Sequence, residues 1–104
     1  MTRTSDDKKE PGAGRYFAEV VIPNKKGLHA RASAQFVRCA AGFTAAVRVT
    51  REGHTVGGTS IMGLMMLAAG PGTTIKVSAA GPEAREAIAA ITKLVESKFN
   101  EEGT

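Results

Sequence analysis

The chain has 104 residues and a mass of 10.8 kDa, which is enough for one domain. Hydrophobic residues make up 42% and charged residues 23%, a balance typical of a globular protein rather than a disordered one. No apolar run approaches the roughly 18 residues of a membrane span, and the first 15 residues lack the apolar core of a secretory signal. The single cysteine, Cys39, cannot form an internal disulfide. We therefore expect one cytoplasmic domain without membrane insertion.

The net charge of +4 is concentrated in one part of the chain. Between residues 25 and 51 there are basic residues and no acidic one: Lys25, Lys26, Arg31, Arg38, Arg48 and Arg51. Such a region favours an anionic ligand or an acidic protein partner. A small nucleic-acid-binding protein is the alternative, but the chain has no tryptophan and one tyrosine for base stacking, and it has no zinc-finger or homeodomain motif. We therefore expect no nucleic-acid partner.

The first half of the chain predicts a tail, a strand and a helix. Residues 1–14 are rich in charge, proline and glycine, which predicts a flexible tail before a domain over residues 15–104. Alternating β-branched residues predict a strand over residues 16–22. After a loop that contains Gly27, apolar residues at helical spacing predict a helix over residues 30–41, which Gly42 ends.

The second half continues in the same way, with strands over 44–50 and 54–58, a helix over 61–69, a strand over 74–79 and a helix over 82–99. Glu52-Gly53 is typical of a hairpin turn, and Ser60 is a favourable residue to cap the helix that follows it. Each strand has one apolar face, and the first and last helices each have one apolar stripe. The pattern predicts an α+β fold, an open-faced β-sandwich of the order β-α-β-β-α-β-α, with a four-stranded antiparallel sheet and three helices on one face.

His29 stands at the junction of the Gly27 loop and the first helix. A helix begins with backbone N–H groups that have no partner within the helix, and its dipole is positive there. A phosphoryl group on the His29 ring would meet these donors, and Arg31 in the first turn could bind the same oxygens. The alternative is a histidine that only caps the helix. We expect no metal, because Cys39 and His54 are not at ligand spacing.

The predicted helix over residues 61–69 is apolar on nearly every side. If Leu64, Leu67 and Ala68 point inward, Ile61, Met62, Met65 or Met66 must partly face water. Exposed methionines can adapt to several partners, which predicts a docking surface. The alternative is a core helix covered by the tail or a loop. Phosphorylation of Ser60 would place about −2 charge beside this surface, although the residue can equally serve as a helix cap alone.

These motifs resemble the histidine-containing phosphocarrier protein (HPr) family of the bacterial phosphoenolpyruvate-dependent phosphotransferase system. The resemblance covers roughly residues 17–99 and rests on Gly27-Leu28-His29-Ala30-Arg31, Ala34-Gln35-Phe36-Val37, Gly42-Phe43, Ser60-Ile61-Met62-Gly63-Leu64-Met65 and Gly72-Thr73. It implies that His29 is phosphorylated on Nδ1 by enzyme I and passes the group to an enzyme II component, with Arg31 binding the phosphate. It also implies that Ser60 is the target of an HPr kinase/phosphorylase, and that partners dock on Ile61, Met62 and Met65.

We add Arg38 to this docking surface as a basic residue at its rim. The protein is then expected to act as a monomeric carrier without a cofactor, with a phosphohistidine intermediate rather than as a stand-alone enzyme. A regulatory binding module switched at Ser60 is the alternative. The chain departs from the family in Ala32, where many members have proline, and in Lys26, where some members have a small polar residue. These departures leave both a sugar-uptake and a nitrogen-related branch open.

Overall fold

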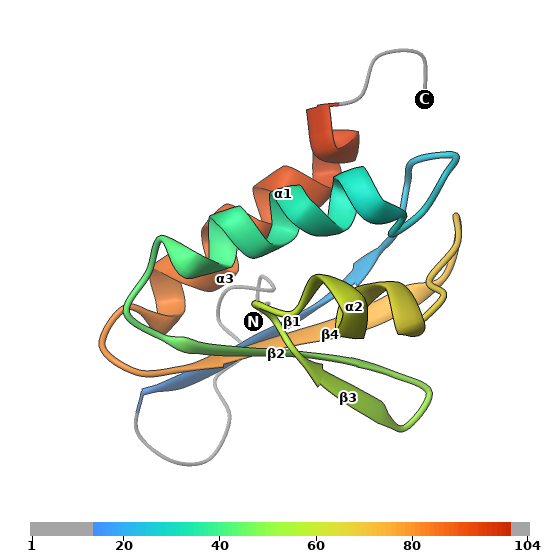
Figure 1. Ribbon diagram of the computed structural model, residues 1–104. Helices are drawn as coiled ribbons and strands as arrows, with labels where there is room; N and C mark the ends of the chain where they lie inside the picture. The colour runs from blue at the N-terminus through green and yellow to red at the C-terminus, as the bar shows by residue number, and fades with distance from the viewer. Residues whose placement is uncertain (1–13, 101–104) are drawn as a thin grey trace, which may run out of the picture.

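The computed structural model describes residues 14–100. Its four strands form one antiparallel sheet in the order β1-β4-β2-β3, with β1 at Arg15–Val21, β2 at Ala46–Arg51, β3 at His54–Gly57 and β4 at Thr74–Ala80. The three helices are α1 at Ala30–Ala41, α2 at Ile61–Met66 and α3 at Ala84–Glu96, and a short 3-10 turn, Lys98–Asn100, follows α3. The helices cover one face of the sheet (Figure 1). The predicted open-faced α+β sandwich is confirmed.

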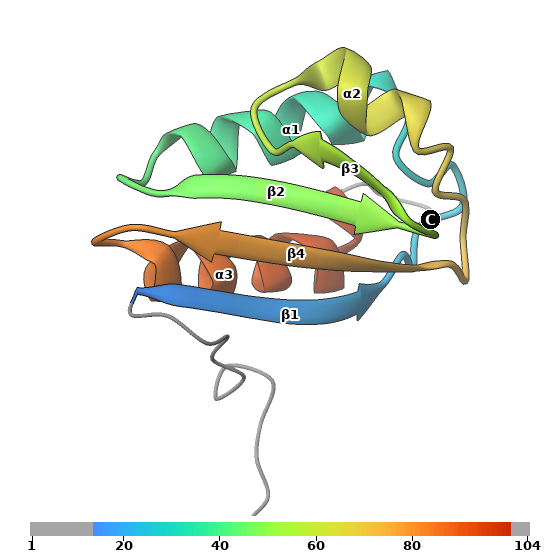
Figure 2. The same cartoon turned by 90° about the horizontal axis from the view of Figure 1, so that it is seen from below.

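The core lies between the sheet and the helices. Successive strand residues alternate between the two faces, so that Ile75, Val77 and Ala79 of β4 are buried while the residues between them are not. Phe36 of α1 and Ile91 of α3 are fully buried on the opposite side of this core. The helix α2 lies over the β3 end of the sheet and beside the N-terminal half of α1 (Figure 2). This packing brings the residues that follow α2 against the loop that precedes α1, where the N–H of Leu28 donates to the carbonyl of Ala69.

The boundaries of two helices differ from the prediction. Helix α2 ends at Met66 instead of residue 69, because Ala68 adopts the left-handed conformation with φ of 52°. Helix α3 covers Ala84–Glu96 instead of residues 82–99, and Phe99 turns into the core with φ of 57°. In both places a tertiary contact decides where the helix stops, which local propensity does not encode.

The boundaries of the strands differ from the predicted ones by at most two residues. The first strand begins and ends one residue earlier than expected, the second begins at Ala46, and the hairpin turn is at Glu52-Gly53 as predicted. The predicted tail, apart from Gly14, lies outside the described residues. Across residues 14–100, no helix is both long and apolar enough to cross a membrane.

Candidate functional site

His29 is the N-cap of α1, as the sequence predicted. Its backbone is extended, with φ of −77° and ψ of −177°, and its carbonyl accepts the first helical hydrogen bond, from the amide of Ser33 at 2.8 Å. Its ring atom Nδ1 accepts a hydrogen bond from the backbone N–H of Arg31 at 3.3 Å. An accepting Nδ1 needs its lone pair, so the neutral ring carries its proton on Nε2. The lone pair of Nδ1 is therefore directed at the start of the helix.

The start of α1 has an electrostatic character that favours an anion. Helices commonly carry acidic residues in their first turn, where these offset the positive end of the dipole, and α3 follows this pattern with Glu86. Helix α1 has no acidic residue in its first turn. Instead Arg31 is exposed there, and Lys25 and Lys26 are exposed in the loop that precedes it. Uncompensated positive potential and backbone N–H donors together form a binding site for an anionic group.

The loop before His29 is fixed by close contacts. Gly27 has φ of 63°, and a Cβ atom there would lie 2.4 Å from the carbonyl oxygen of Ala69. Only glycine fits this approach. The buried side chain of Asn24 donates to the carbonyl of Gly27 at 2.9 Å, and the N–H of Leu28 donates to the carbonyl of Ala69 at 3.0 Å. The sequence predicted a loop around Gly27, but no sequence signal pointed to the role of Asn24 in holding the turn.

Helix α2 presents an apolar surface to water. Its N-cap is Ser60, as predicted, whose Oγ accepts from the N–H of Gly63 at 2.9 Å. We define the methionine patch as the four exposed apolar residues of α2, with exposed fractions of 41%, 72%, 42% and 78% for Ile61, Met62, Met65 and Met66. A contiguous exposed apolar patch is a feature of interaction surfaces.

The inward side of α2 agrees only partly with the prediction. Leu64 and Leu67 are buried as expected, but the expectation for Ala68 was wrong, because this residue is exposed after the helix has ended. Met66 is the most exposed member of the patch, although the docking residues predicted on this helix were Ile61, Met62 and Met65. Its spacing of four residues from Met62 is the signal that could have included it.

Arg38 lies in the last turn of α1 and is exposed. It follows Arg31 by seven residues, or two helical turns, so both lie on the same side of the helix about 10 Å apart along its axis. The structure therefore places Arg38 on the side of α1 that carries Arg31. Its role in docking stays a prediction.

The other reactive side chains do not join this site. Cys39 lies in the C-terminal half of α1, where partial burial raises the pKa of its thiol and keeps it protonated at neutral pH. His54 is exposed in the β2–β3 hairpin. The described part of the chain contains no group of three or more histidine, cysteine, aspartate or glutamate residues that could hold a metal ion.

Comparison with known proteins identifies the family to which this arrangement belongs. Residues 17–97 match the family model described as the PTS HPr component phosphorylation site. The chain belongs to the HPr family. It is 45% identical over 83 residues to phosphocarrier protein HPr of Cupriavidus necator, a match that covers 80% of this chain and 93% of that protein.

Solved structures of the HPr family have the same fold. HPr of Thermoanaerobacter tengcongensis superposes with a TM-score of 0.80 at 43% identity, over 83% of this chain and 97% of that one. Crh, a catabolite-repression protein of Bacillus subtilis, superposes with a TM-score of 0.66 at 38% identity, over 76% of this chain and 91% of that one. The likeness thus extends to a phosphocarrier and to a protein named for catabolite repression.

Proposed function

We propose that the chain carries a phosphoryl group on Nδ1 of His29, which it accepts from enzyme I and passes to an enzyme II component of a sugar or nitrogen-related phosphotransferase system. The observation that supports this most directly is the position of Nδ1. It faces the backbone N–H of Arg31 at the start of a helix whose first turn has no acidic residue. Membership of the HPr family supports the same conclusion.

The transfer step follows from this geometry. The lone pair of Nδ1 attacks the phosphorus atom, and a new N–P bond forms while the bond between phosphorus and the donor breaks. The donor keeps the electron pair of the broken bond, and the ring of His29 keeps its proton on Nε2. The N–H of Arg31, released from Nδ1, then donates to a phosphoryl oxygen, and the Arg31 guanidinium adds charge-assisted hydrogen bonds.

Transfer onward is the reverse of the same step. A phosphorylated imidazole is a good donor, because neutral imidazole is a stable leaving group. The hydrogen bond at 3.3 Å is at the long end of the N–H donor range, so breaking it costs little. The site can therefore load and unload without a large change in the fold.

Partners would dock on the methionine patch and on the basic residues near it. Thioether side chains adapt to differently shaped surfaces, which fits a carrier that must meet both enzyme I and an enzyme II component. Arg31 and Arg38 would steer acidic partners to the patch, and this gives fast association without tight binding. We propose that the chain acts as a monomer in the cytoplasm.

Ser60 is the proposed regulatory site, acted on by an HPr kinase/phosphorylase where one is present. Ser60 is an exposed residue next to Ile61 and Met62 in the chain, and a phosphate on it would place negative charge against the docking surface. The likeness to Crh favours a second candidate function, a regulatory module switched at this serine. The two functions differ in their dependence on His29.

The test is the intact mass of the chain after incubation with phosphoenolpyruvate and purified enzyme I, with and without acid treatment. We expect one acid-labile phosphoryl group on the wild-type chain and none on His29→Ala. An enzyme I that phosphorylates another carrier but leaves this chain unmodified would contradict the carrier function. Biological output that is unchanged in His29→Ala would favour the regulatory module.

A further inference from the structure

The segment that joins α2 to β4 lies against the loop that carries His29. Both ribbon views show the two segments side by side at the same end of the sheet (Figures 1 and 2). Their contact is the hydrogen bond from the N–H of Leu28 to the carbonyl of Ala69, at 3.0 Å, together with the close approach of Gly27 to the same carbonyl. The position of the Ala69 carbonyl therefore sets the position of the residue just before His29.

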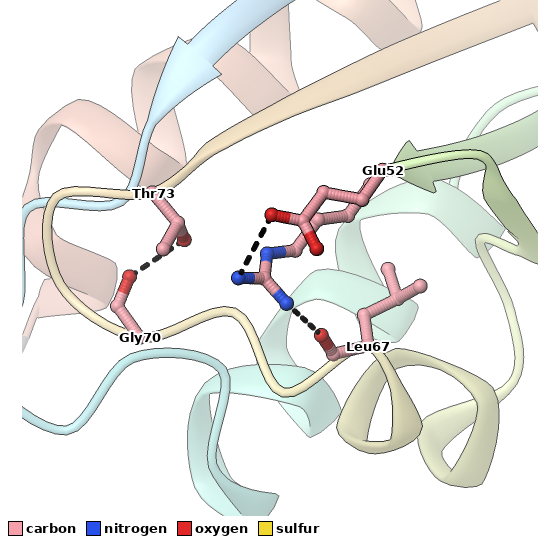
Figure 3. Close-up of polar contacts among 5 residues, drawn as sticks. Glu52, Leu67, Gly70 and Thr73 are labelled. Atoms are coloured by element: carbon pink, nitrogen blue, oxygen red, sulfur yellow. Dashed lines mark hydrogen bonds and ion pairs between the residues drawn. The ribbon is translucent and has the colours of Figure 1, made fainter.

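One end of this segment is held by a side chain from the sheet. Arg51, the last residue of β2, donates through Nη1 to the carbonyl of Leu67 at 2.9 Å, and its Nη2 lies 3.6 Å from the carboxylate of Glu52 (Figure 3). The Arg51 side chain is only 22% exposed. Leu67 is the C-cap of α2, where carbonyl groups lack partners within the helix, so the guanidinium supplies a donor that the helix does not.

The other end is held by the backbone of the sheet. The N–H of Ile22 donates to the carbonyl of Thr73 at 2.9 Å, and the N–H of Gly72 donates to the carbonyl of Ile22 at 2.8 Å. The hydroxyl of Thr73 also donates to the carbonyl of Gly70 at 2.7 Å (Figure 3). Ala69 thus lies between a backbone anchor at Thr73 and a side-chain anchor at Leu67.

We propose that Arg51 is a positioning residue for phosphoryl transfer at His29. It fixes the Leu67 carbonyl, and with it the turn through Ala68 that presents the Ala69 carbonyl to Leu28. Arg51 does not touch the reacting atoms. The inference rests on the proposed function, because it assigns Arg51 a role in that transfer. Misplacement of reacting groups by a fraction of an ångström is enough to slow a transfer step.

The experiment compares Arg51→Met with Arg48→Met, with the chain as the varied substrate of enzyme I. Both variants lose one positive charge from β2, but Arg48 is exposed and lines a hollow with Arg15 and Ser78, whereas Arg51 lines a different hollow with Leu67 and Ala68. We expect Arg51→Met to lower kcat about fivefold with KM changed less than twofold, because the methionine patch is intact. Arg48→Met is expected to leave kcat unchanged.

Two further measurements distinguish a positioning role of Arg51 from a general effect of the substitution on stability. Hydrogen exchange at the Leu28 amide is expected to accelerate in Arg51→Met more than exchange at β4 amides, because only the Leu28 bond depends on the segment. Arg51→Lys is expected to recover part of the lost kcat, since an ammonium group can donate to the Leu67 carbonyl. If Arg51→Met does not fold, Arg51→Lys provides the test, with kcat lowered about twofold and faster exchange at Leu28.

Wild-type kcat in Arg51→Met, or an equal loss of kcat in Arg48→Met, would overturn the positioning role and leave the carrier function standing. If Arg51→Met does not fold, the positioning role would be overturned by an Arg51→Lys variant whose kcat and Leu28 hydrogen exchange equal those of the wild type. A wild-type chain that takes no phosphoryl group from active enzyme I would overturn the carrier function and this role with it. The wild-type measurement thus separates the two failures.

Discussion

Helices α1 and α2 begin with the same local device but use it differently. In each, a side chain at the N-cap accepts a hydrogen bond from a backbone N–H of the first turn: His29 from Arg31 at 3.3 Å, and Ser60 from Gly63 at 2.9 Å. Helix α2 has six residues and needs its cap, because short helices are marginal. Helix α1 has twelve residues and is held by the packing of Phe36. In the proposed transfer, the longer helix can therefore give up its cap bond so that Nδ1 can bond to phosphorus.

The largest expected effect comes from separating capping from nucleophilicity at His29. Asparagine is among the best N-cap residues but has no nucleophilic nitrogen lone pair, because its amide is delocalised. We expect His29→Asn to take no acid-labile phosphoryl group while its free energy of unfolding stays within about 1 kcal/mol of wild type. Intact mass measures the first and urea denaturation the second.

Ser60→Ala is the matched change at the other cap. It is expected to accept the phosphoryl group on His29 as the wild type does, although its helix cap is lost. Acid-labile phosphate on His29→Asn would contradict the assignment, because it would place the nucleophile elsewhere.

The second-largest expected effect comes from the positive charge of Arg31, which acts together with the backbone N–H donors at the start of α1. Replacing Arg31 with alanine leaves its N–H in place and removes the guanidinium. A hydrogen bond to a charged group contributes about 1.5–3 kcal/mol, so we expect Arg31→Ala to slow the transfer step about 10- to 100-fold. Rapid-quench measurement of phosphoryl uptake at saturating enzyme I gives this rate.

Arg38→Ala is the matched control for Arg31→Ala, because it removes the same charge two turns along the same side of α1. We expect it to raise KM for enzyme I through weaker steering, with the transfer rate unchanged. A loss of transfer rate as large as that of Arg31→Ala would show that net charge, and not contact with the phosphoryl group, controls the reaction.

The third effect is at the cap of α2. Aspartate caps a helix as serine does and favours the positive end of the dipole. We expect Ser60→Asp to fold as stably as the wild type and to raise KM for enzyme I several-fold at low salt, because its charge lies beside Ile61 and Met62. The increase is expected to shrink as salt screens it. A rise in KM that does not respond to salt would point to lost shape complementarity instead.

Much of the fold could be predicted from local signals. Alternating apolar residues located the strands, and Glu52-Gly53 marked a turn in which both residues have positive φ, at 49° and 83°. The position of His29 as a helix cap followed from Gly27 and from the apolar spacing after residue 30. These features depend on residues near one another in the chain, so a single sequence is sufficient to find them.

The parts that could not be predicted depend on contacts between distant residues. Alanine has the highest helix propensity, which favours continuing α2 through Ala68, but the structure turns there so that the Ala69 carbonyl reaches Leu28. In the sequence, Arg51 is recognisable only as one of several basic residues. Its contact with Leu67 exists only when β2 and α2 are packed. The support of the His29 loop is therefore a property of the tertiary structure.

The smallest expected effect is at the other end of α2. Ala68 is exposed and has φ of 52°, a conformation that costs a residue with a Cβ atom about 1–2 kcal/mol. Glycine has no such cost but loses more chain entropy on folding, so we expect Ala68→Gly to gain about 0.5 kcal/mol in urea denaturation.

Ala89 of α3 is the matched alanine for this change, because it is exposed but lies within a regular helix, where glycine is expected to cost about 1 kcal/mol. A gain in the free energy of unfolding for glycine at position 68 and a loss for glycine at position 89 would show that backbone conformation, and not the lost methyl group, decides the effect. In the double variant Ser60→Ala/Ala68→Gly, the gain at the end of α2 is expected to offset part of the loss at its start. Because glycine readily keeps the left-handed turn at residue 68, the Ala69 carbonyl is expected to stay against Leu28 and phosphoryl uptake on His29 to stay at the wild-type level. A decrease in the double variant but not in Ser60→Ala would show that the turn after α2 helps to position His29.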